Sequence, residues 1–203
     1  MISGCATKHF RIGIFARSCV KFVDTAEEMT VGNLVKSDSR LMDMLTGYAA
    51  AHQHPFNIAV HMIGIPVIML GVFIALSWAS VDIGSISLNG AHVATLMLFV
   101  FYFSLDRLFS LAFLLFATPI AALATRIGLE PMQTSGAFAA ATFVGGYIAQ
   151  FIGHAVERSA PVILKHPIQA NLAAPFFTVV ELFKFSGLRD DMFNEVQKRI
   201  ANL

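Results

Sequence analysis

Apolar residues in this chain form long runs separated by short polar segments. Residues 56–80 contain no Asp, Glu, Lys or Arg. A helix of that length is about 37 Å long, which exceeds the ~30 Å hydrocarbon core of a bilayer. A second run, residues 136–153, contains several Gly and Ala residues, which let neighbouring helices approach closely. Both runs therefore predict membrane-spanning helices.

The apolar run at residues 91–125 is interrupted by the polar tetrapeptide SLDR. One long helix would place Asp106 and Arg107 in the middle of the membrane, at a cost of about 2.5–3.5 kcal/mol for each charge. Two shorter helices, 91–104 and 108–125, would instead place this pair in a tight turn. We therefore predict a helical hairpin, with each helix near the usual lower length limit for a span.

The remaining polar segments separate or flank these spans. Residues 81–90 are rich in Gly, Ser and Asn and predict a turn. Residues 172–185 are apolar but contain Glu181 and Lys184, which favours a re-entrant or interfacial segment. The tail, 187–203, predicts a polar amphipathic helix. The predicted fold is therefore all-α: an integral membrane helical bundle of about four spans with interfacial or re-entrant helices.

The first 28 residues differ in composition from the rest of the chain. Four basic residues precede the first acidic residue, Asp24: Lys8, Arg11, Arg17 and Lys21. A basic, acid-poor segment of this kind fits a targeting peptide. The alternatives are a disordered basic tail or an over-extended start, since Met29 could begin the same protein. Residues 30–50 predict a short amphipathic helix. We accordingly divide the chain into a basic tail or targeting segment, 1–28, and a single membrane domain, 29–203.

Overall composition supports a membrane protein and excludes several other classes. Of the 203 residues, 56% are hydrophobic and only 13% are charged, against roughly 25% charged residues in soluble domains. A net charge of +1 gives no basis for nucleic-acid binding. The two cysteines, Cys5 and Cys19, have neither metal-type spacing nor the pattern of a disulfide framework. The expected environment is therefore a lipid membrane.

Five of the seven histidines fall at the ends of predicted spans. His52, His54 and His61 open the first span, and His154 and His166 follow the last one. With four spans, an even number, the start of the first and the end of the fourth lie on the same membrane face. The two histidine groups are then predicted to meet, whereas a single long middle helix would separate them.

The distribution of Lys and Arg predicts the orientation of the bundle. Most of these residues lie in the N-terminal segment, in the loop at 157–165 and in the C-terminal tail, while the turn at 81–90 has none. The positive-inside rule then places the histidine face in the cytoplasm, at a bacterial inner membrane or a eukaryotic endomembrane.

Helical spacing groups the polar residues at each end of the predicted site. Pro55 favours a helix start, which leaves His52 in the preceding segment, free to turn back toward His61. Asn57 and His61 are four residues apart and share a helix face. In the second group, Gln150, His154 and Glu157 are spaced i, i+4 and i+7, and so also share one helix face. Because imidazole nitrogens are ligands for Fe, Zn, Cu and Ni, the two groups together are candidates for one metal site.

Two other interpretations of these histidines remain open at this point. The protein is a non-enzymatic membrane protein, such as a lipid-binding module or scaffold, if the histidines are structural. It is a small transporter or proton relay if His61 carries protons within the membrane, although the sequence lacks the internal repeats typical of transporters. Motifs of other enzyme classes, including HExxH, the GxSxG elbow and the P-loop, are absent from the sequence.

The two histidine motifs together resemble the 2-hydroxy-fatty-acid dioxygenase family, a group of small membrane proteins with a fungal member in fatty-acid α-oxidation. The similarity covers roughly residues 41–185 and depends on HQHPFNIAVHMIGIP and, later in the chain, QFIGHAVERSAP. The resemblance implies an Fe(II)-dependent enzyme whose metal is held by His52, His61 and His154. It also implies that Asn57 and Glu157 support the site.

Two positions depart from the usual pattern of that family. His54 stands where the family usually has Asn, and His166 stands where it usually has Asn or Asp. His166 is our candidate for a fourth metal ligand, and His54 or a carboxylate is the alternative. A changed substrate is a second implication of these departures.

The activity that the resemblance implies is oxidative decarboxylation of a 2-hydroxy fatty acid to the fatty acid one carbon shorter plus CO2. The electrons released match those that one O2 takes up on reduction to water, so Fe(2+) and O2 suffice without a nucleotide cofactor. Glu157 is expected to orient a histidine or to accept a proton, with Asn57 beside it. The acyl chain is expected to lie among the apolar helices.

Overall fold

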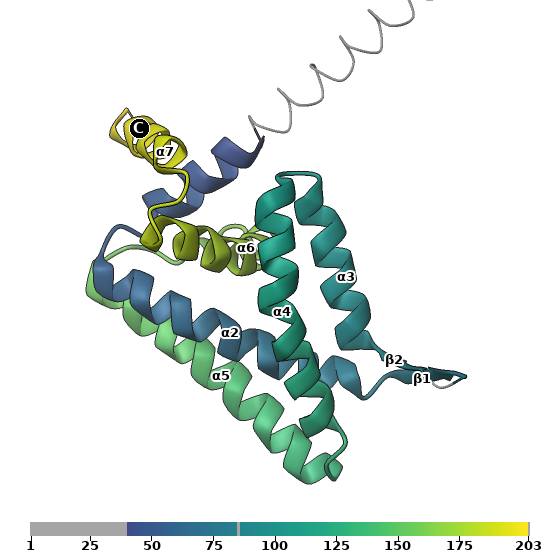
Figure 1. The fold of residues 1–203 in the computed structure, drawn as a ribbon. Coiled ribbons are helices and arrows are strands. Elements are labelled where there is room, and N and C mark those ends of the chain that lie inside the picture. The colour runs from purple at the N-terminus through teal and green to yellow at the C-terminus, as the bar shows by residue number, and fades with distance from the viewer. Residues whose placement is uncertain (1–39, 85, 203) are drawn as a thin grey trace, which may run out of the picture. The chain divides into compact units, whose positions relative to one another are not determined.

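The structure, a computed structural model, describes residues 40–84 and 86–202. Helices account for most of this part of the chain, so the predicted all-α class is confirmed (Figure 1). The predicted tail or targeting segment, 1–28, lies outside the described residues, as does the first part of the helix predicted at 30–50. Residues 40–50 of that helix are helical, as predicted.

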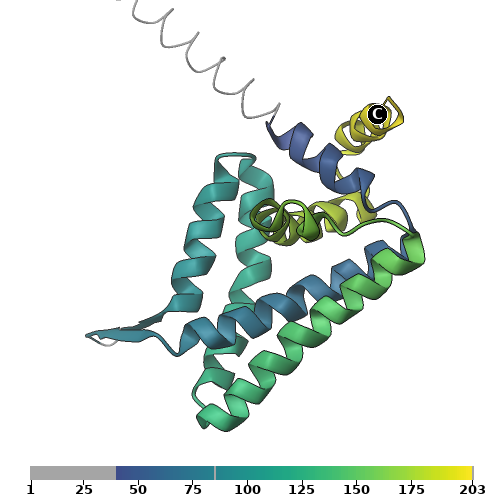
Figure 2. The same cartoon turned by 180° about the vertical axis from the view of Figure 1, so that it is seen from behind.

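Helices α2 (Pro55–Ser77) and α5 (Met132–Glu157) lie side by side and antiparallel, and theirs is the most extensive helix pairing (Figures 1 and 2). Gly71 shows why they approach so closely. A Cβ atom at this position would lie 2.7 Å from Thr142 Oγ1 and 2.8 Å from the Ala139 carbonyl oxygen. The pairing brings the start of α2 next to the end of α5.

The predicted helical hairpin is present as α3 (Gly90–Phe103) and α4 (Arg107–Gly128). Asp106 lies in the turn between them, and its Oδ1 accepts a hydrogen bond from the Phe109 amide at 2.9 Å. Its Oδ2 lies 2.6 Å from the Arg189 guanidinium. The acidic residue of the SLDR sequence therefore caps a helix and pairs with a cation, as a turn at the membrane surface requires.

Three helices, α2, α4 and α5, are each long and apolar enough to cross a membrane. Helix α3 is apolar but has only 14 residues, which gives it a length of about 21 Å. It runs back along α4, so the two helices form the hairpin that the sequence predicts (Figure 1). The described part of the chain is therefore an all-α membrane bundle.

The segment between α2 and α3 is more regular than the predicted turn. It forms a two-stranded antiparallel hairpin, with β1 (Ser80–Ile83) paired to β2 (Ile86–Asn89) and Val81 opposite Leu88. Polar and apolar residues alternate along both strands, and this period-two pattern favours strand pairing. Gly84, with φ of +64°, takes up the left-handed conformation of the turn.

Helix α6 (Pro167–Phe185) starts earlier than the re-entrant or interfacial segment predicted at 172–185, because Pro167 suits the first turn of a helix. It follows a short 3-10 turn, η1 (Val162–Leu164), and precedes α7 (Asp190–Ala201), the amphipathic helix predicted for the tail. Helix α6 contacts both α2 and α4.

An aromatic cluster fixes α6 against the α3–α4 hairpin. Tyr102 is fully buried and donates a hydrogen bond to the Leu172 carbonyl oxygen at 2.7 Å. The rings of Tyr102 and Phe109 lie with their centroids 4.9 Å and 5.6 Å from that of Phe176. This packing holds α6 across the end of the bundle at which α2 begins and α5 ends.

Candidate metal centre

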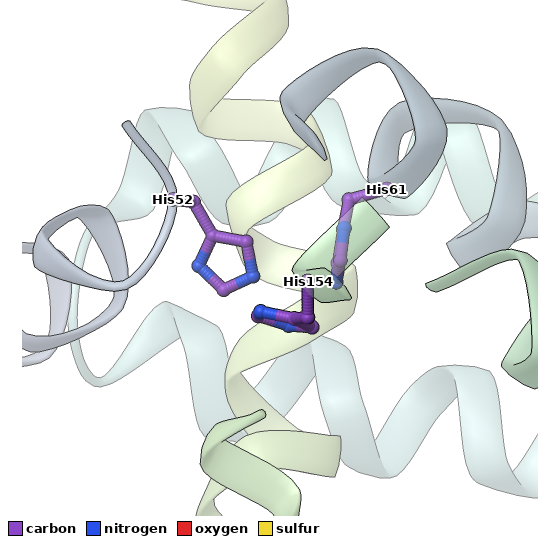
Figure 3. A group of neighbouring side chains, drawn as sticks. All are labelled: His52, His61 and His154. Carbon is purple, nitrogen blue, oxygen red and sulfur yellow. The ribbon is translucent and has the colours of Figure 1, made fainter. Parts of the chain in front are cut away.

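Three histidines from separate segments converge at this end of the bundle (Figure 3). His52 comes from the loop before α2, His61 from α2 itself and His154 from the last turn of α5. One ring nitrogen of each lies within 4.8 Å of those of the other two, and all three side chains are buried. Two ligands of one metal each lie ~2 Å from it, so this spacing fits a shared ion.

Each imidazole is anchored through Nδ1, which leaves Nε2 available for another partner. The anchors are the Tyr48 carbonyl oxygen for His52 at 2.7 Å, the Asn57 carbonyl oxygen for His61 at 3.0 Å, and Ser159 Oγ for His154 at 2.9 Å. A carbonyl oxygen only accepts hydrogen bonds, so Nδ1 carries the proton in the first two and Nε2 keeps its lone pair. This is the arrangement in which metal-bound histidines are usually held.

The Nε2 atom of His52 is buried and has no hydrogen-bond partner among the described residues. Leaving such an atom unsatisfied costs about 1–3 kcal/mol, so its burial indicates a ligand. Burial also lowers the pKa of His52 to about 4, despite the opposing effect of the Tyr48 carbonyl. The imidazole is therefore neutral near pH 7, which is the form that binds metals.

Aromatic rings pack against His52 and hold its orientation. The Tyr48 ring stacks on the imidazole with centroids 4.1 Å apart and planes only 6° from parallel. Phe177 of α6 lies 5.6 Å away. Two separate elements, the helix at 40–50 and α6, therefore fix the His52 ring, although it lies in a loop.

Glu157 joins the end of α5 to the loop that carries His52. Its Oε1 accepts hydrogen bonds from the backbone amides of Gln53 and His54, at 2.6 and 2.9 Å, and its Oε2 accepts one from the side-chain amide of Asn57. The carboxylate makes no hydrogen bond to the imidazole rings of His52, His61 and His154 among the contacts of the described residues. It acts on the peptide next to His52, and so determines where that histidine lies relative to His154.

Asn57 lies at a close contact between α2 and α5. Its side chain is fully buried, and it reaches Glu157 only because the facing residue on α5 is Gly153, where a Cβ atom would overlap Asn57 Oδ1. Asn57 therefore contributes to the site twice, through its side chain to Glu157 and through its carbonyl oxygen to His61.

The other two predicted histidines lie apart from this group. His54 is exposed and caps the start of α2, where its ring Nδ1 accepts a hydrogen bond from the Phe56 amide at 3.2 Å. His166 is exposed and immediately precedes α6. Neither belongs to the buried cluster, so the geometry gives no support to His166 as a fourth ligand.

Two residues that hold the histidines were not predicted from the sequence. Tyr48 falls within the helix predicted at 30–50 without being marked as a site residue, and Ser159 was not singled out. The signal for Tyr48 was its position four residues before His52, which is the spacing for contact across one helical turn. Ser159 has no such signal, because it bonds to His154 only after the chain reverses at Arg158, where φ is +59°.

The three histidines line one part of an apolar cavity of about 400 Å³. Its walls come mainly from α2, α5 and α6, and include Ile65, Met69, Phe73, Phe143, Phe151 and Ala174. None of the described residues that line it is Asp, Glu, Lys or Arg. A pocket of this size and character suits an apolar ligand whose polar end lies at the histidines.

Comparison with known proteins identifies the family. A family model described as 2-hydroxy-palmitic acid dioxygenase Mpo1-like matches residues 39–185. The chain belongs to this family. The matched range includes all three clustered histidines and ends with α6. A curated relative, 2-hydroxy-palmitic acid dioxygenase MPO1 of Saccharomyces cerevisiae, is 29% identical over 146 residues, which cover 71% of this chain and 80% of the relative. No solved structure matches the chain.

Proposed function

We propose that this protein is an Fe(II)-dependent dioxygenase that converts a 2-hydroxy fatty acid and O2 into the fatty acid one carbon shorter plus CO2. His52, His61 and His154 are the proposed metal ligands. The observation that carries the proposal is the convergence of three buried imidazoles within 4.8 Å in a member of a family described by a dioxygenase activity.

The donor set fits iron. Imidazole nitrogens are ligands for non-haem iron, and no cysteine lies among the residues of the cluster that would favour a softer metal. The unsatisfied Nε2 of His52 supplies one lone pair directed into the group. When bound, Fe(II) would supply the redox chemistry with O2 and a template for the oxygen atoms of the substrate.

The residues around the histidines hold and orient them. Carbonyl and hydroxyl groups fix the Nδ1 atoms, and the Tyr48 ring fixes the plane of His52. For Glu157 the contacts favour positioning over proton transfer, because both of its oxygens already accept hydrogen bonds. Asn57 supports the same carboxylate.

The cavity supports a substrate with an apolar chain. Each CH2 group buried in it would contribute about 0.8 kcal/mol of binding free energy. The apolar walls would exclude water from the acyl chain of the substrate. Its carboxyl end would then lie at the histidines, because the remaining lining is largely apolar. A soluble, strongly polar substrate would lose its hydration in this cavity without compensation.

Family membership favours the enzyme over a scaffold or a proton relay. We further propose that the protein is integral to its membrane, with the histidine end facing the cytoplasm. The three apolar helices support the first statement, and the distribution of Lys and Arg supports the second.

Metal analysis of the purified protein tests the proposed function. We expect close to one iron per chain, and we expect EDTA to abolish consumption of 2-hydroxypalmitate and added Fe(II) to restore it. His61→Ala and His154→Ala should lose iron, whereas His166→Ala, at an exposed position outside the cluster, should keep it. Full turnover by metal-free protein would show that the proposal is wrong.

A further inference from the structure

Gln150 is a polar side chain in the cavity wall whose hydrogen-bonding capacity is unused. Its Nε2 is buried and has no partner, and its amide makes no hydrogen bond within the part of the chain that the structure describes. Gln150 lies one helical turn before His154, on the same face of α5. An unsatisfied amide next to the three histidines indicates a missing polar partner.

Two other uncharged polar side chains of the cavity wall, Tyr147 and Asn171, are already paired. The Tyr147 hydroxyl donates to Asn171 Oδ1 at 2.6 Å, and the Asn171 amide donates to the Pro167 carbonyl oxygen at 2.9 Å. No Lys or Arg is among the lining residues of the described chain. Gln150, by contrast, has a buried donor with no partner among the described residues.

The position of Gln150 is defined by its packing against α2. A Cβ atom on Gly64 would lie 3.4 Å from Gln150 Cγ and 3.6 Å from its Nε2, so the side chain lies flat across this glycine. Gly64 comes three residues after His61, which puts the amide one turn from two of the three histidines. A half-turn about the last side-chain bond exchanges the amide nitrogen and oxygen, so the NH2 group can face either side.

We propose that Gln150 binds the substrate by donating a hydrogen bond to a carboxylate oxygen of the 2-hydroxy acid. This inference rests on the proposed function. A carboxylate placed at the histidines enters an apolar cavity that lacks a cationic side chain, and a desolvated carboxylate oxygen needs a donor. Hydrogen bonds to charged groups are the stronger ones, and the Gln150 amide, which lines the same cavity as the histidines, has an unused donor for one.

The inference predicts a defect that is specific for the carboxylate. Gln150→Met keeps the length of the side chain and removes the donor, and Gln150→Leu serves as a second variant. In the iron-loaded protein without O2, both should bind 2-hydroxypalmitate about 10- to 100-fold more weakly than wild type. Binding of 1,2-hexadecanediol, which keeps the chain and hydroxyl but lacks the carboxylate, should change by less than about threefold.

Controls separate this inference from the proposed function. Gln133→Leu, an exposed glutamine on the same helix, should bind both ligands like wild type, and iron content should be equal in all variants. KM for 2-hydroxypalmitate should rise in both Gln150 variants. If wild type turns over the acid and the Gln150 variants bind acid and diol as wild type does, this inference is wrong and the function stands. If wild type neither binds nor consumes a 2-hydroxy acid, both this inference and the proposed function are wrong.

Discussion

At the scale of single residues, the site depends on side chains that do not touch a ligand. Glu157 is the clearest case, because it holds the backbone between His52 and Pro55, whereas the clustered imidazoles of His52, His61 and His154 are buried. Its partners are two backbone amides, one side-chain amide and the Ser159 hydroxyl, all of them donors. A side chain with two acceptor oxygens is therefore required at this position. An ionised carboxylate has both, whereas a protonated acid or an amide has a donor in place of one of them.

Glu157→Gln should weaken iron binding without unfolding the protein. The glutamine amide has the same size, but its NH2 group cannot accept a hydrogen bond from the amide that it faces. The loop that carries His52 would therefore be held less tightly. Changes to residues that orient metal ligands typically lower metal affinity 10- to 100-fold, and we expect a loss in this range in an iron titration.

Glu130→Gln is the matched control, because Glu130 is exposed and lies beyond the far end of α5. Its iron affinity should equal that of wild type. Unchanged affinity in Glu157→Gln would contradict a positioning role for Glu157.

At the scale of elements, the α2–α5 pair sets the geometry of the site. One histidine lies on each of these helices, and the loop with the third is attached to α5 through Glu157. Their separation is set by small residues at the contact, of which Gly71 has the tightest surroundings on the half of α2 away from the histidines. Changes along this contact should therefore affect the histidines at a distance.

Gly71→Ala should destabilise the protein by about 1–3 kcal/mol, because its Cβ would lie less than 3 Å from atoms of α5 and the helices must separate. Thermal unfolding in detergent measures the effect. Gly145→Ala is the control: no atom lies within 4 Å of a Cβ there, and alanine favours a helix by up to about 1 kcal/mol over glycine. Equal melting temperatures for the two variants would show that the close contact is unimportant.

Much of this arrangement is predictable from the sequence, for identifiable physical reasons. Uninterrupted apolar runs predict the long helices, and the charge pair in SLDR predicts the turn, because two charges in the hydrocarbon core are too costly. Pro55 predicts a helix start that leaves His52 in the segment before the helix. These local signals also predict that the two histidine groups meet, because the hairpin makes the number of predicted spans even.

The parts that the sequence did not predict depend on long-range contacts or on weak local patterns. Strands β1 and β2 have only four residues each, too few for their alternation to outweigh the turn-forming residues around them. The exposure of His166 depends on where α6 packs, which the aromatic contacts of Tyr102 and Phe176 determine. The contact between Ser159 and His154 depends on the left-handed conformation of Arg158.

At the scale of the whole described bundle, the histidines and the β1–β2 hairpin lie at opposite ends of α2 (Figure 1). If α2 spans the membrane, the two ends face different compartments. Ser87→Cys and His166→Cys place exposed thiols near these two ends. We expect a membrane-impermeant maleimide added to intact bacterial cells to label Ser87→Cys, and to label His166→Cys only after the inner membrane is permeabilised. Labelling of both positions from the same side would contradict the predicted topology.

The hydrogen bond between the His54 amide and Glu157 joins residues 103 positions apart. During synthesis, His52 and His61 are therefore made long before His154 and Glu157, which complete the site. A ribosome-bound chain that ends before α5 has His52 and His61 but lacks both His154 and the carboxylate that fixes the loop. If the cluster holds iron as proposed, metal capture would be delayed until α5 has been inserted, and a chain that stops short of α5 would lack a finished site.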